Sequence, residues 1–275
     1  MNQIVATGIA SIVGACIGSF LNVCIARWPA NLSVVTPRSR CPTCERPIQA
    51  LENIPILGWL MLGGRCAGCK ERISIQYPLV ELLIAVVWGV AVWYYGATFA
   101  ALRVAVFTTV MIGIAITDAK HYLIPDGFTL FGLLWVLGTA FVGLAIPDAT
   151  PFEGVYAAFV GACAGAGAIA IAGWLGELAL GKEAMGFGDV TLMAVVGAAV
   201  GPNRALLTIF IAAALGVATF LLVIYPIVKL RAVQQRGDGE LPLVPFGVFL
   251  APAAVVALLW GSQMIDWYTG TLLGI

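Results

Sequence analysis

The hydrophobic positions of the chain gather in long apolar runs that are separated by short polar segments. A helix needs about 20 apolar residues to cross the hydrocarbon core of a bilayer, and most of these runs approach or exceed that length. The pattern therefore predicts an all-α polytopic membrane protein with about eight transmembrane helices. The expected helices cover residues 4–26, 79–95, 99–117, 128–146, 154–178, 189–201, 205–228 and 246–265.

Composition supports a membrane protein. The chain is 61% hydrophobic and 10% charged, whereas a soluble domain carries about 25% charged residues. A net charge of zero gives no indication of nucleic-acid binding. The first run, residues 1–20, has no Lys or Arg ahead of it. Because a cleavable signal peptide has a basic n-region, we expect this run to be a retained helix.

Basic residues are distributed unevenly between the two sides of the expected membrane domain. Twelve follow the first, third, fifth and seventh runs, and only Arg103 and Arg204 fall on the opposite side. Because cytoplasmic loops carry an excess of Lys and Arg, the first side is expected to be cytoplasmic and both termini external. The twelve residues are Arg27, Arg38, Arg40, Arg46, Arg65, Lys70, Arg72, Lys120, Lys182, Lys229, Arg231 and Arg236.

A polar insert interrupts the apolar pattern after the first run. We divide the chain into a first transmembrane helix (1–26), a cytoplasmic insert (27–77) and a seven-helix membrane core (78–275). The insert contains two Cys-x-x-Cys pairs separated by 21 residues, which fits a tetrahedral four-thiolate zinc site with a slightly long spacer. Such a closed site is structural, and its metal is coupled to folding. The expected ligands are Cys41, Cys44, Cys66 and Cys69.

Two disulfides or free thiols are the alternatives for these cysteines. Disulfides are disfavoured on the reducing cytoplasmic side of the membrane. The other cysteines, Cys16, Cys24 and Cys163, lie in apolar runs and are expected to be buried packing residues. The small-residue spacings Gly14-x-x-x-Gly18 and Gly161-x-x-x-Gly165 predict closely packed helix pairs.

The sixth run is too short to cross a bilayer. Asp189 to the Gly201-Pro202 break is 13 residues, or about 20 Å of helix, against a hydrocarbon core of about 30 Å. The helix must begin earlier, continue past Pro202, or leave Asp189 recessed in a water-filled notch. We favour the notch, because Gly186 and Gly188 indicate irregular backbone, which is tolerated at membrane depth beside a cavity.

Two aspartates at the ends of apolar runs are the candidate chemical groups. Asp118 closes the third run and Asp189 opens the sixth, so both are expected at the cytoplasmic face. An ionisable residue in such a position is costly and indicates function. Asp189 and Asp126 can each be explained as helix N-caps. Asp118 cannot, because a helix C-terminus disfavours negative charge; its alternative explanation is a salt bridge to a basic neighbour such as Lys120.

A pair of carboxylates suits hydrolysis of an amide by activated water. One ionised aspartate takes a proton from water while the other, protonated, polarises the scissile carbonyl, and the two share one proton. The chain has no Gly-x-Ser-x-Gly and no His-Glu-x-x-His, so serine and zinc peptidase schemes lack support.

Several motifs, taken together and in order, resemble those of the bacterial type IV prepilin peptidases, the leader peptidase/N-methyltransferases that are membrane aspartyl peptidases of the Gly-x-Gly-Asp kind. The resemblance runs along nearly the whole chain. Its motifs are Gly18-Ser19-Phe20-Leu21-Asn22-Val23, Arg27-x-Pro29, Ser39-Arg40-Cys41-Pro42-x-Cys44, Asn53-Ile54-Pro55, Gly64-Arg65-Cys66-x-x-Cys69, Tyr77-Pro78-x-Val80-Glu81, Asp118 with Ile124-Pro125-Asp126, Gly186-Phe187-Gly188-Asp189, and Pro245-Phe246-Gly247.

The resemblance implies a function in the bacterial inner membrane. The expected reaction is cleavage, after a glycine and on the cytoplasmic side, of the leader of type IV prepilins or type II secretion pseudopilins. Methylation of the new N-terminus, with S-adenosylmethionine as donor, is expected to follow. Carried over by position, Asp118 and Asp189 are the catalytic pair and Asp126 is structural. Thr191 departs from the family, which often has Lys there.

No residue marks the S-adenosylmethionine site in the sequence. Glu52, Asn53 and the arginines near them are candidates for contact with substrate or cofactor, although solvated loop residues are more often ordinary. Three other functions remain: a peptidase without methyltransferase activity, a proton-coupled transporter, and a zinc-stabilised membrane scaffold. A transporter would place its carboxylates near the bilayer midplane within inverted repeats, and a scaffold would tolerate loss of both aspartates.

Overall fold

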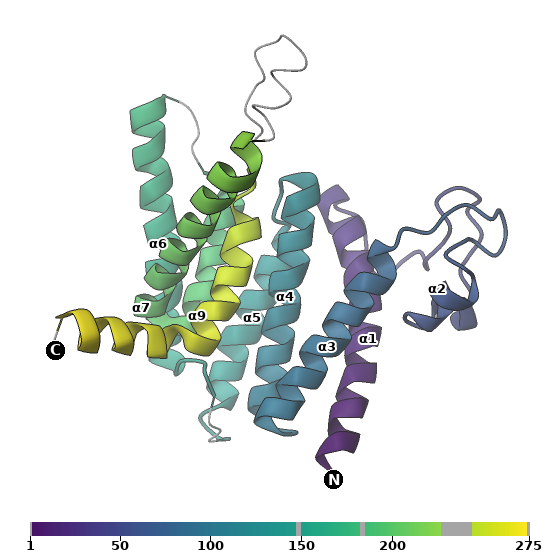
Figure 1. The fold of residues 1–275 in the computed structure, drawn as a ribbon, viewed down its shortest axis with the longest axis horizontal. Helices are drawn as coiled ribbons and strands as arrows, with labels where there is room; N and C mark the ends of the chain where they lie inside the picture. Colours follow the sequence, from purple (N-terminus) through teal and green to yellow (C-terminus); the bar gives the residue numbers. More distant parts are fainter. Residues whose placement is uncertain (1, 147–149, 182–184, 227–243, 274–275) are drawn as a thin grey trace. The chain divides into compact units, whose positions relative to one another are not determined.

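Helices are the regular secondary structure in the part of the chain that the computed structural model describes, residues 2–146, 150–181, 185–226 and 244–273 (Figure 1). Within that part the only pairings outside helices are isolated antiparallel bridges, Arg40 with Pro47 and Arg65 with Arg72. The helices are α1 (Gln3–Arg27), η1 (Trp28–Ala30), η2 (Ala50–Asn53), α2 (Leu57–Met61), α3 (Gln76–Tyr95), α4 (Phe99–His121), α5 (Asp126–Val142), α6 (Val155–Leu180), α7 (Phe187–Thr219), η3 (Phe220–Ile224), α9 (Gly247–Tyr268) and η4 (Thr269–Leu273).

Six of the described helices are long and apolar enough to cross a membrane: α1, α3, α4, α6, α7 and α9. Helix α5 is apolar but has 17 residues, about 26 Å. The expected all-α membrane class is therefore confirmed. Eight spans were expected. One of the two that are missing is the 17-residue α5, and the other is lost because α7 contains both residues 189–201 and most of 205–228. The last two residues of that run, 227 and 228, lie outside the described part.

Helix α7 is interrupted at the position that the sequence indicates. Gly201 has φ 77° and ψ 173°, which is far from helical geometry, and Pro202 follows it. A positive φ is accessible to glycine without a Cβ clash, and proline lacks the N–H that would continue the helical hydrogen bonds. The predicted break is confirmed, and the helix therefore consists of two halves.

The second half of α7 runs antiparallel to α9. Arg204, at its start, packs against Gly261, near the end of α9; a Cβ on that glycine would lie 3.0 Å from Arg204 Cδ. Gly216, twelve residues later, faces Phe249, near the start of α9, at 3.6 Å by the same measure. Figure 1 shows the second half of α7 running back toward the start of α9.

The chain divides into two compact units, Met1–Gly113 with Ile146–Thr150, and Ile114–Ala145 with Pro151–Ile275. In the first unit, glycines let α1 and α3 pack backbone to backbone (Figure 1). A Cβ on Gly14 would lie 2.8 Å from Ile84 O, and a Cβ on Gly18 would lie 2.7 Å from Glu81 Cα. The predicted close packing at the first glycine pair is confirmed.

In the second unit, glycines bring α6 and α7 equally close. A Cβ on Gly161 would overlap the carbonyl of Gly197, and one on Gly165 would overlap the carbonyl of Met193. These side-chain-free faces explain why the first half of α7 is buried along most of its length. The predicted close packing at the second glycine pair is confirmed.

Candidate active site and metal centre

Asp118 lies in the last turns of α4 with 5% of its surface exposed. Its Oδ2 accepts a hydrogen bond from the backbone N–H of Val248 at 3.1 Å, and the N–H of Gly247 also donates to its carboxylate. These two residues begin α9. The positive end of the α9 dipole thus faces Asp118 and compensates for the unfavourable C-terminal end of α4.

Glycine at position 247 is required for this arrangement. A Cβ there would lie 2.7 Å from Asp118 Oδ2 and 2.9 Å from Ile124 Cδ1. Real Cβ atoms essentially never approach so closely, so any larger residue displaces the carboxylate, the isoleucine or the start of α9. Pro245-Phe246-Gly247 stands out as a motif in the sequence, but its spacing does not indicate which residues it contacts.

Asp189 is the third residue of α7, whose N-cap is Gly186. Interpretation of Asp189 as the N-cap is therefore wrong. Its half-buried carboxylate instead accepts a hydrogen bond from the Gly186 N–H, one turn back. Thr191 donates its hydroxyl to the Gly188 carbonyl at 2.9 Å. The Thr191 hydroxyl, at the position where the family often has Lys, thus contacts the backbone of the first turn of α7.

Ile124 connects the two aspartates. It is buried in the turn between α4 and α5, and it faces both the glycine before Asp189 and the glycine that contacts Asp118. A Cβ on Gly188 would lie 2.9 Å from Ile124 Cβ. The Asp118 carboxylate also acts electrostatically on Asp189. The structure therefore brings the two candidate residues, which are 71 positions apart (189 − 118), into one cluster.

The other proposed partners lie outside this cluster. The hydrogen-bond partners of the Asp118 carboxylate are backbone N–H groups, and no ion pair to it is found among the described residues. Asp126 is the exposed first residue of α5, after the N-cap Pro125. Its carboxylate therefore does not join Asp118 and Asp189 in the buried site.

The four cysteines of the insert converge as the sequence predicts. Their sulfur atoms all lie within 4.8 Å of one another. The Cys41–Cys69 Sγ distance is 3.7 Å and the Cys44–Cys66 Sγ distance is 3.9 Å. Zn–S bonds of about 2.3 Å in a tetrahedron place sulfurs about 3.8 Å apart. All four thiols are free, and the donor set therefore fits zinc.

The two cysteine pairs adopt the same backbone structure with an offset of 25 residues (66 − 41). In each pair, the N–H of the first cysteine donates to the carbonyl five residues later, and its carbonyl accepts from the N–H four residues later. Two such knuckles, each closed by one bridge, are the geometry that presents four sulfurs to one ion. The bonds are Cys41 N to Arg46 O, Glu45 N to Cys41 O, Cys66 N to Glu71 O and Lys70 N to Cys66 O.

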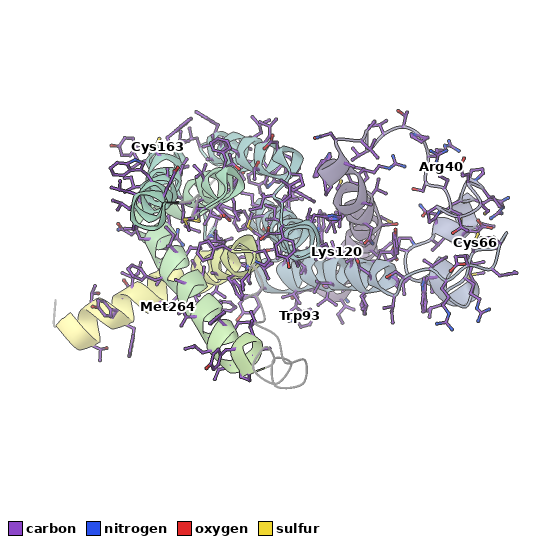
Figure 2. The ribbon with its side chains drawn as sticks, turned by 90° about the horizontal axis from the view of Figure 1, so that it is seen from above. Arg40, Cys66, Trp93, Lys120, Cys163 and Met264 are labelled. Atoms are coloured by element: carbon purple, nitrogen blue, oxygen red, sulfur yellow. The ribbon has the colours of Figure 1, made fainter. Side chains whose placement is uncertain are left out.

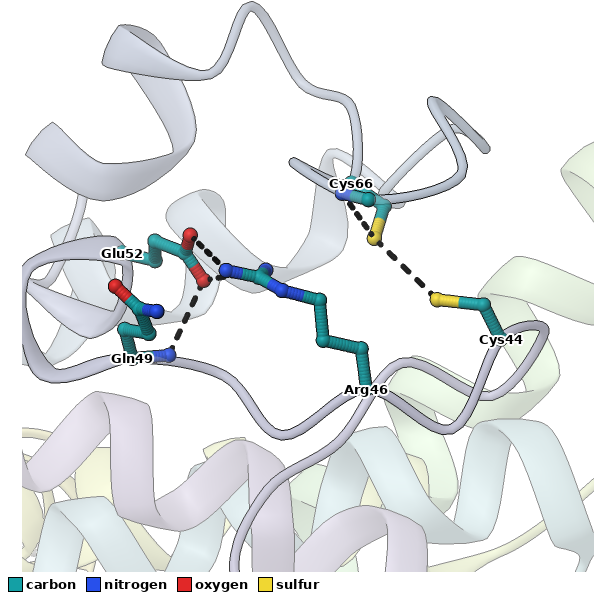
Figure 3. A network of polar contacts seen from close by, with 6 residues as sticks. Cys44, Arg46, Gln49, Glu52 and Cys66 are labelled. Atoms are coloured by element: carbon teal, nitrogen blue, oxygen red, sulfur yellow. Dashed lines mark hydrogen bonds and ion pairs between the residues drawn. The ribbon is translucent and has the colours of Figure 1, made fainter.

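Backbone groups stabilise the Cys41 thiolate, and an ion pair fixes the loop that follows it. The backbone N–H groups of Cys44 and Thr43 lower the pKa of the Cys41 thiol to about 6. Arg46 makes two hydrogen bonds to the Glu52 carboxylate, at 2.9 and 3.0 Å (Figure 3). These bonds, with a further one from the Gln49 N–H, hold the pKa of Glu52 below its usual value. The Glu52 carboxylate is therefore engaged in contacts within the insert.

The remaining cysteines divide by exposure. Cys24 is buried, as expected, whereas Cys16 and Cys163 are exposed on the helix surfaces. The expectation of burial is wrong for these two, because the apolar pattern of a membrane helix does not distinguish its protein-facing side from its outer side. Figure 2 labels Cys163 on α6 and Cys66 in the insert.

In the described part of the chain, the fold and its sites define a helical membrane protein with a partly buried carboxylate pair and a four-cysteine insert. Residues 12–95 match the bacterial peptidase A24 N-terminal domain, and residues 105–221 match the type IV leader peptidase family. No solved structure matches the chain significantly.

Three curated relatives, each called a prepilin leader peptidase/N-methyltransferase, illustrate the similarity. The protein from Stutzerimonas stutzeri is 36% identical over 94% of this chain and 92% of its own length. That from Pseudomonas aeruginosa is 34% identical over 94% and 91%, and that from Neisseria gonorrhoeae is 33% identical over 77% and 80%. The chain therefore belongs to the type IV leader peptidase family.

Proposed function

We propose that this protein is an aspartyl endopeptidase that removes the leader of type IV prepilins or type II secretion pseudopilins and then methylates the new N-terminus. The observation that carries the peptidase assignment is the joining of Asp118 and Asp189 through Ile124, Gly188 and Gly247, in a chain of this family. The names of the relatives support the pairing of peptidase and N-methyltransferase activities.

The contacts suggest different roles for the two aspartates. Two N–H groups at the start of α9 stabilise negative charge on Asp118, which makes it the general base. Asp189 then holds the shared proton and donates a hydrogen bond to the scissile carbonyl. Asp118 takes a proton from water, and the water oxygen attacks the carbonyl carbon while Asp189 protonates the carbonyl oxygen.

Collapse of the tetrahedral intermediate completes hydrolysis. The proton held by Asp118 passes to the leaving nitrogen, the C–N bond breaks, and one hydroxyl of the intermediate returns its proton to Asp189. The leader leaves with a C-terminal glycine carboxylic acid, and the mature chain leaves with a free amine. The pair is thus restored with a single shared proton.

The zinc role is structural. Cys41, Cys44, Cys66 and Cys69 would hold the ion, which would neutralise four converging thiolates and tie the two knuckles together. A four-sulfur site leaves no open coordination position for catalysis. S-adenosylmethionine would supply the methyl group as a sulfonium. Glu52 is a poor candidate for its contact, because Arg46 already occupies its carboxylate.

The proposed topology has eight crossings, with the two halves of α7 as separate spans and both termini outside. The reversal of α7 at Gly201 supports this count. Charge distribution supports a cytoplasmic position for the insert (27–77) and for the ends of α4 and α7 that carry the aspartates. Four of the twelve residues behind this assignment lie outside the described part of the chain: Lys182, Lys229, Arg231 and Arg236.

One assay separates these functions. The purified protein in lipid nanodiscs is incubated with a prepilin, and mass spectrometry identifies the product. We expect loss of the leader after glycine, followed by a gain of one methyl group when S-adenosylmethionine is added. Cleavage without methylation would show that the protein is a peptidase without methyltransferase activity. An intact prepilin would reject the proposal in favour of a scaffold or transporter.

A further inference from the structure

A second buried carboxylate, besides Asp118, lies in the first unit. Glu81, the sixth residue of α3, is 7% exposed. Its Oε2 accepts the backbone N–H of Ile56 at 2.7 Å, and the Ser19 hydroxyl of α1 also donates to it. No Lys, Arg or His forms an ion pair with Glu81 in the described part of the chain. A buried carboxylate without a cation is costly and indicates a function.

The residue that covers Glu81 has a strained backbone. Ile56 has φ 62° and ψ −53°, a conformation that a β-branched residue adopts only under constraint. Backbone strain of this kind concentrates at functional sites. The hydrogen bond to Glu81 helps to hold Ile56 in place. Opening of the segment would release the strain and uncover the carboxylate.

Asn22 supplies an unused acceptor in the same helix pair. It is 3% exposed, and its Nδ2 donates to the Tyr77 carbonyl at 3.1 Å. Because Nδ2 is engaged, the orientation of the amide is fixed, and its Oδ1 is buried with no hydrogen-bond partner. An unsatisfied buried acceptor requires an explanation, and a missing ligand is one. Asn22 lies one helical turn after Ser19 on α1, and Tyr77 one turn before Glu81 on α3.

We propose that Glu81, Ser19 and Asn22 form a binding site for a protonated primary amine. An ammonium group has three N–H donors and a single positive charge. The site offers one carboxylate, one hydroxyl oxygen and one amide oxygen, with one negative charge in total. The match in donors, acceptors and charge favours an ammonium over a divalent cation, which usually recruits several oxygen ligands and more negative charge.

Two sources of this ammonium exist in the proposed reaction, and this inference rests on that proposed function. One is the free N-terminus of a processed pilin, which methylation requires to be held in place. The other is the α-ammonium group of S-adenosylmethionine. The site lies wholly within the unit that contains the cysteine insert, and its residues belong to three motifs that the peptidase chemistry leaves unused: Gly18–Val23, Asn53–Pro55 with the adjacent Ile56, and Tyr77–Glu81.

The test uses Glu81→Gln in the full-length protein in nanodiscs. This change removes the charge but retains an oxygen that can accept the Ile56 N–H, so the covering segment keeps its anchor. The matched control is Glu45→Gln, which removes an exposed carboxylate of the same unit; among the described residues, Glu45 forms an ion pair with Arg40 at 3.7 Å. Equilibrium binding is measured for two probes, S-adenosylmethionine and a peptide that carries a mature pilin N-terminus.

We expect Glu81→Gln to weaken one probe by about tenfold or more, with the other probe unaffected and Glu45→Gln without effect. The probe that weakens identifies the source of the ammonium. If the peptide is the probe that weakens, acetylation of its N-terminus must weaken its binding to the wild type by the same factor as Glu81→Gln does. Acetylation must not weaken binding to Glu81→Gln any further. Acetylation removes the ammonium charge from the peptide and leaves the protein unchanged. This measurement therefore remains valid even where the variant folds poorly.

Three outcomes would overturn the amine site: both probes bind Glu81→Gln as tightly as the wild type, Glu45→Gln weakens binding equally, or the wild type binds neither probe. Leader cleavage is measured on the same preparations. Since binding is measured with an already processed peptide, a failure to cleave prepilin would reject the proposed peptidase function without deciding the amine site.

Discussion

The backbone N–H of Val248 donates to Asp118 Oδ2 at 3.1 Å, and this bond joins the end of α4 to the start of α9 across 130 residues of sequence. It explains how a carboxylate is accommodated at the C-terminal end of an apolar helix. The partial negative charge of the α4 carbonyls is offset by the partial positive charge of the first α9 amides. A carboxylate can therefore be buried there without a cationic partner among the described residues.

The first prediction concerns the aspartate pair. Replacing Asp118 or Asp189 with Asn should reduce leader cleavage by about 10²–10⁴-fold, because each removes one proton-transfer group. The double variant should be little worse than either single variant, since the two act as a unit. Cleavage rates on a purified prepilin provide the measurement. Asp126→Asn is the control and should retain activity, because Asp126 is exposed at the start of α5; full activity in either single variant at the pair would reject the assignment.

The second prediction concerns the close approach of α9 to Asp118. Gly247→Ala should strongly reduce leader cleavage, because the added Cβ would lie 2.7 Å from Asp118 Oδ2 and must displace it. Gly167→Ala is the control, as nothing lies within 4 Å of the Cβ that it would add. Rates are compared after equal amounts of folded protein are confirmed by gel filtration. Equal rates in the two variants would show that the Asp118–α9 contact is not needed for cleavage.

The third prediction concerns the cysteine insert. Purified protein should contain about one zinc per chain, as measured by mass spectrometry of the metal. Cys41→Ser should lower this content and increase proteolysis of residues 27–77, because metal binding and folding of the insert are coupled. Cys163→Ser, at an exposed position on α6, should change neither. Zinc-free protein with an intact, protease-resistant insert would contradict a structural metal.

The cysteine knuckles and the glycine-mediated helix contacts were predictable from sequence because each depends on local spacing. Four thiols in two Cys-x-x-Cys pairs require little beyond the turns that they create. The contacts of Asp118 were not predictable in this way. Its partners are backbone amides of a helix 130 residues away, and a backbone N–H leaves no signature in the sequence. Gly247 was the one feature of the sequence that pointed to a close contact at the start of α9, but a glycine alone does not indicate what approaches it.

The reversal of α7 shows a similar limit. Gly201-Pro202 indicated a break, and the break is present. Spacing alone does not indicate the direction in which the chain continues. That direction depends on contacts of Arg204, which no periodicity of the sequence encodes. Arg204 donates to the carbonyls of Val200, Leu258 and Pro151 and to the carboxylate of Glu153. The isolated arginine counted as a loop charge is therefore a buried structural group.

The last prediction follows from this arginine. Arg204→Met should destabilise the protein by about 2–3 kcal/mol, because it leaves buried carbonyls and one carboxylate without their donor. The loss should stay below the about 3–5 kcal/mol of a fully buried pair, since the Glu153 side chain remains 37% exposed. Denaturant unfolding in detergent gives the free energy of unfolding. Glu153→Gln keeps an oxygen that can accept from Arg204, now at 2.8 Å, and should lower the free energy of unfolding by less. If both variants lowered it equally, the ion pair alone, and not the carbonyl contacts that hold the two halves of α7, would account for the stabilisation by Arg204.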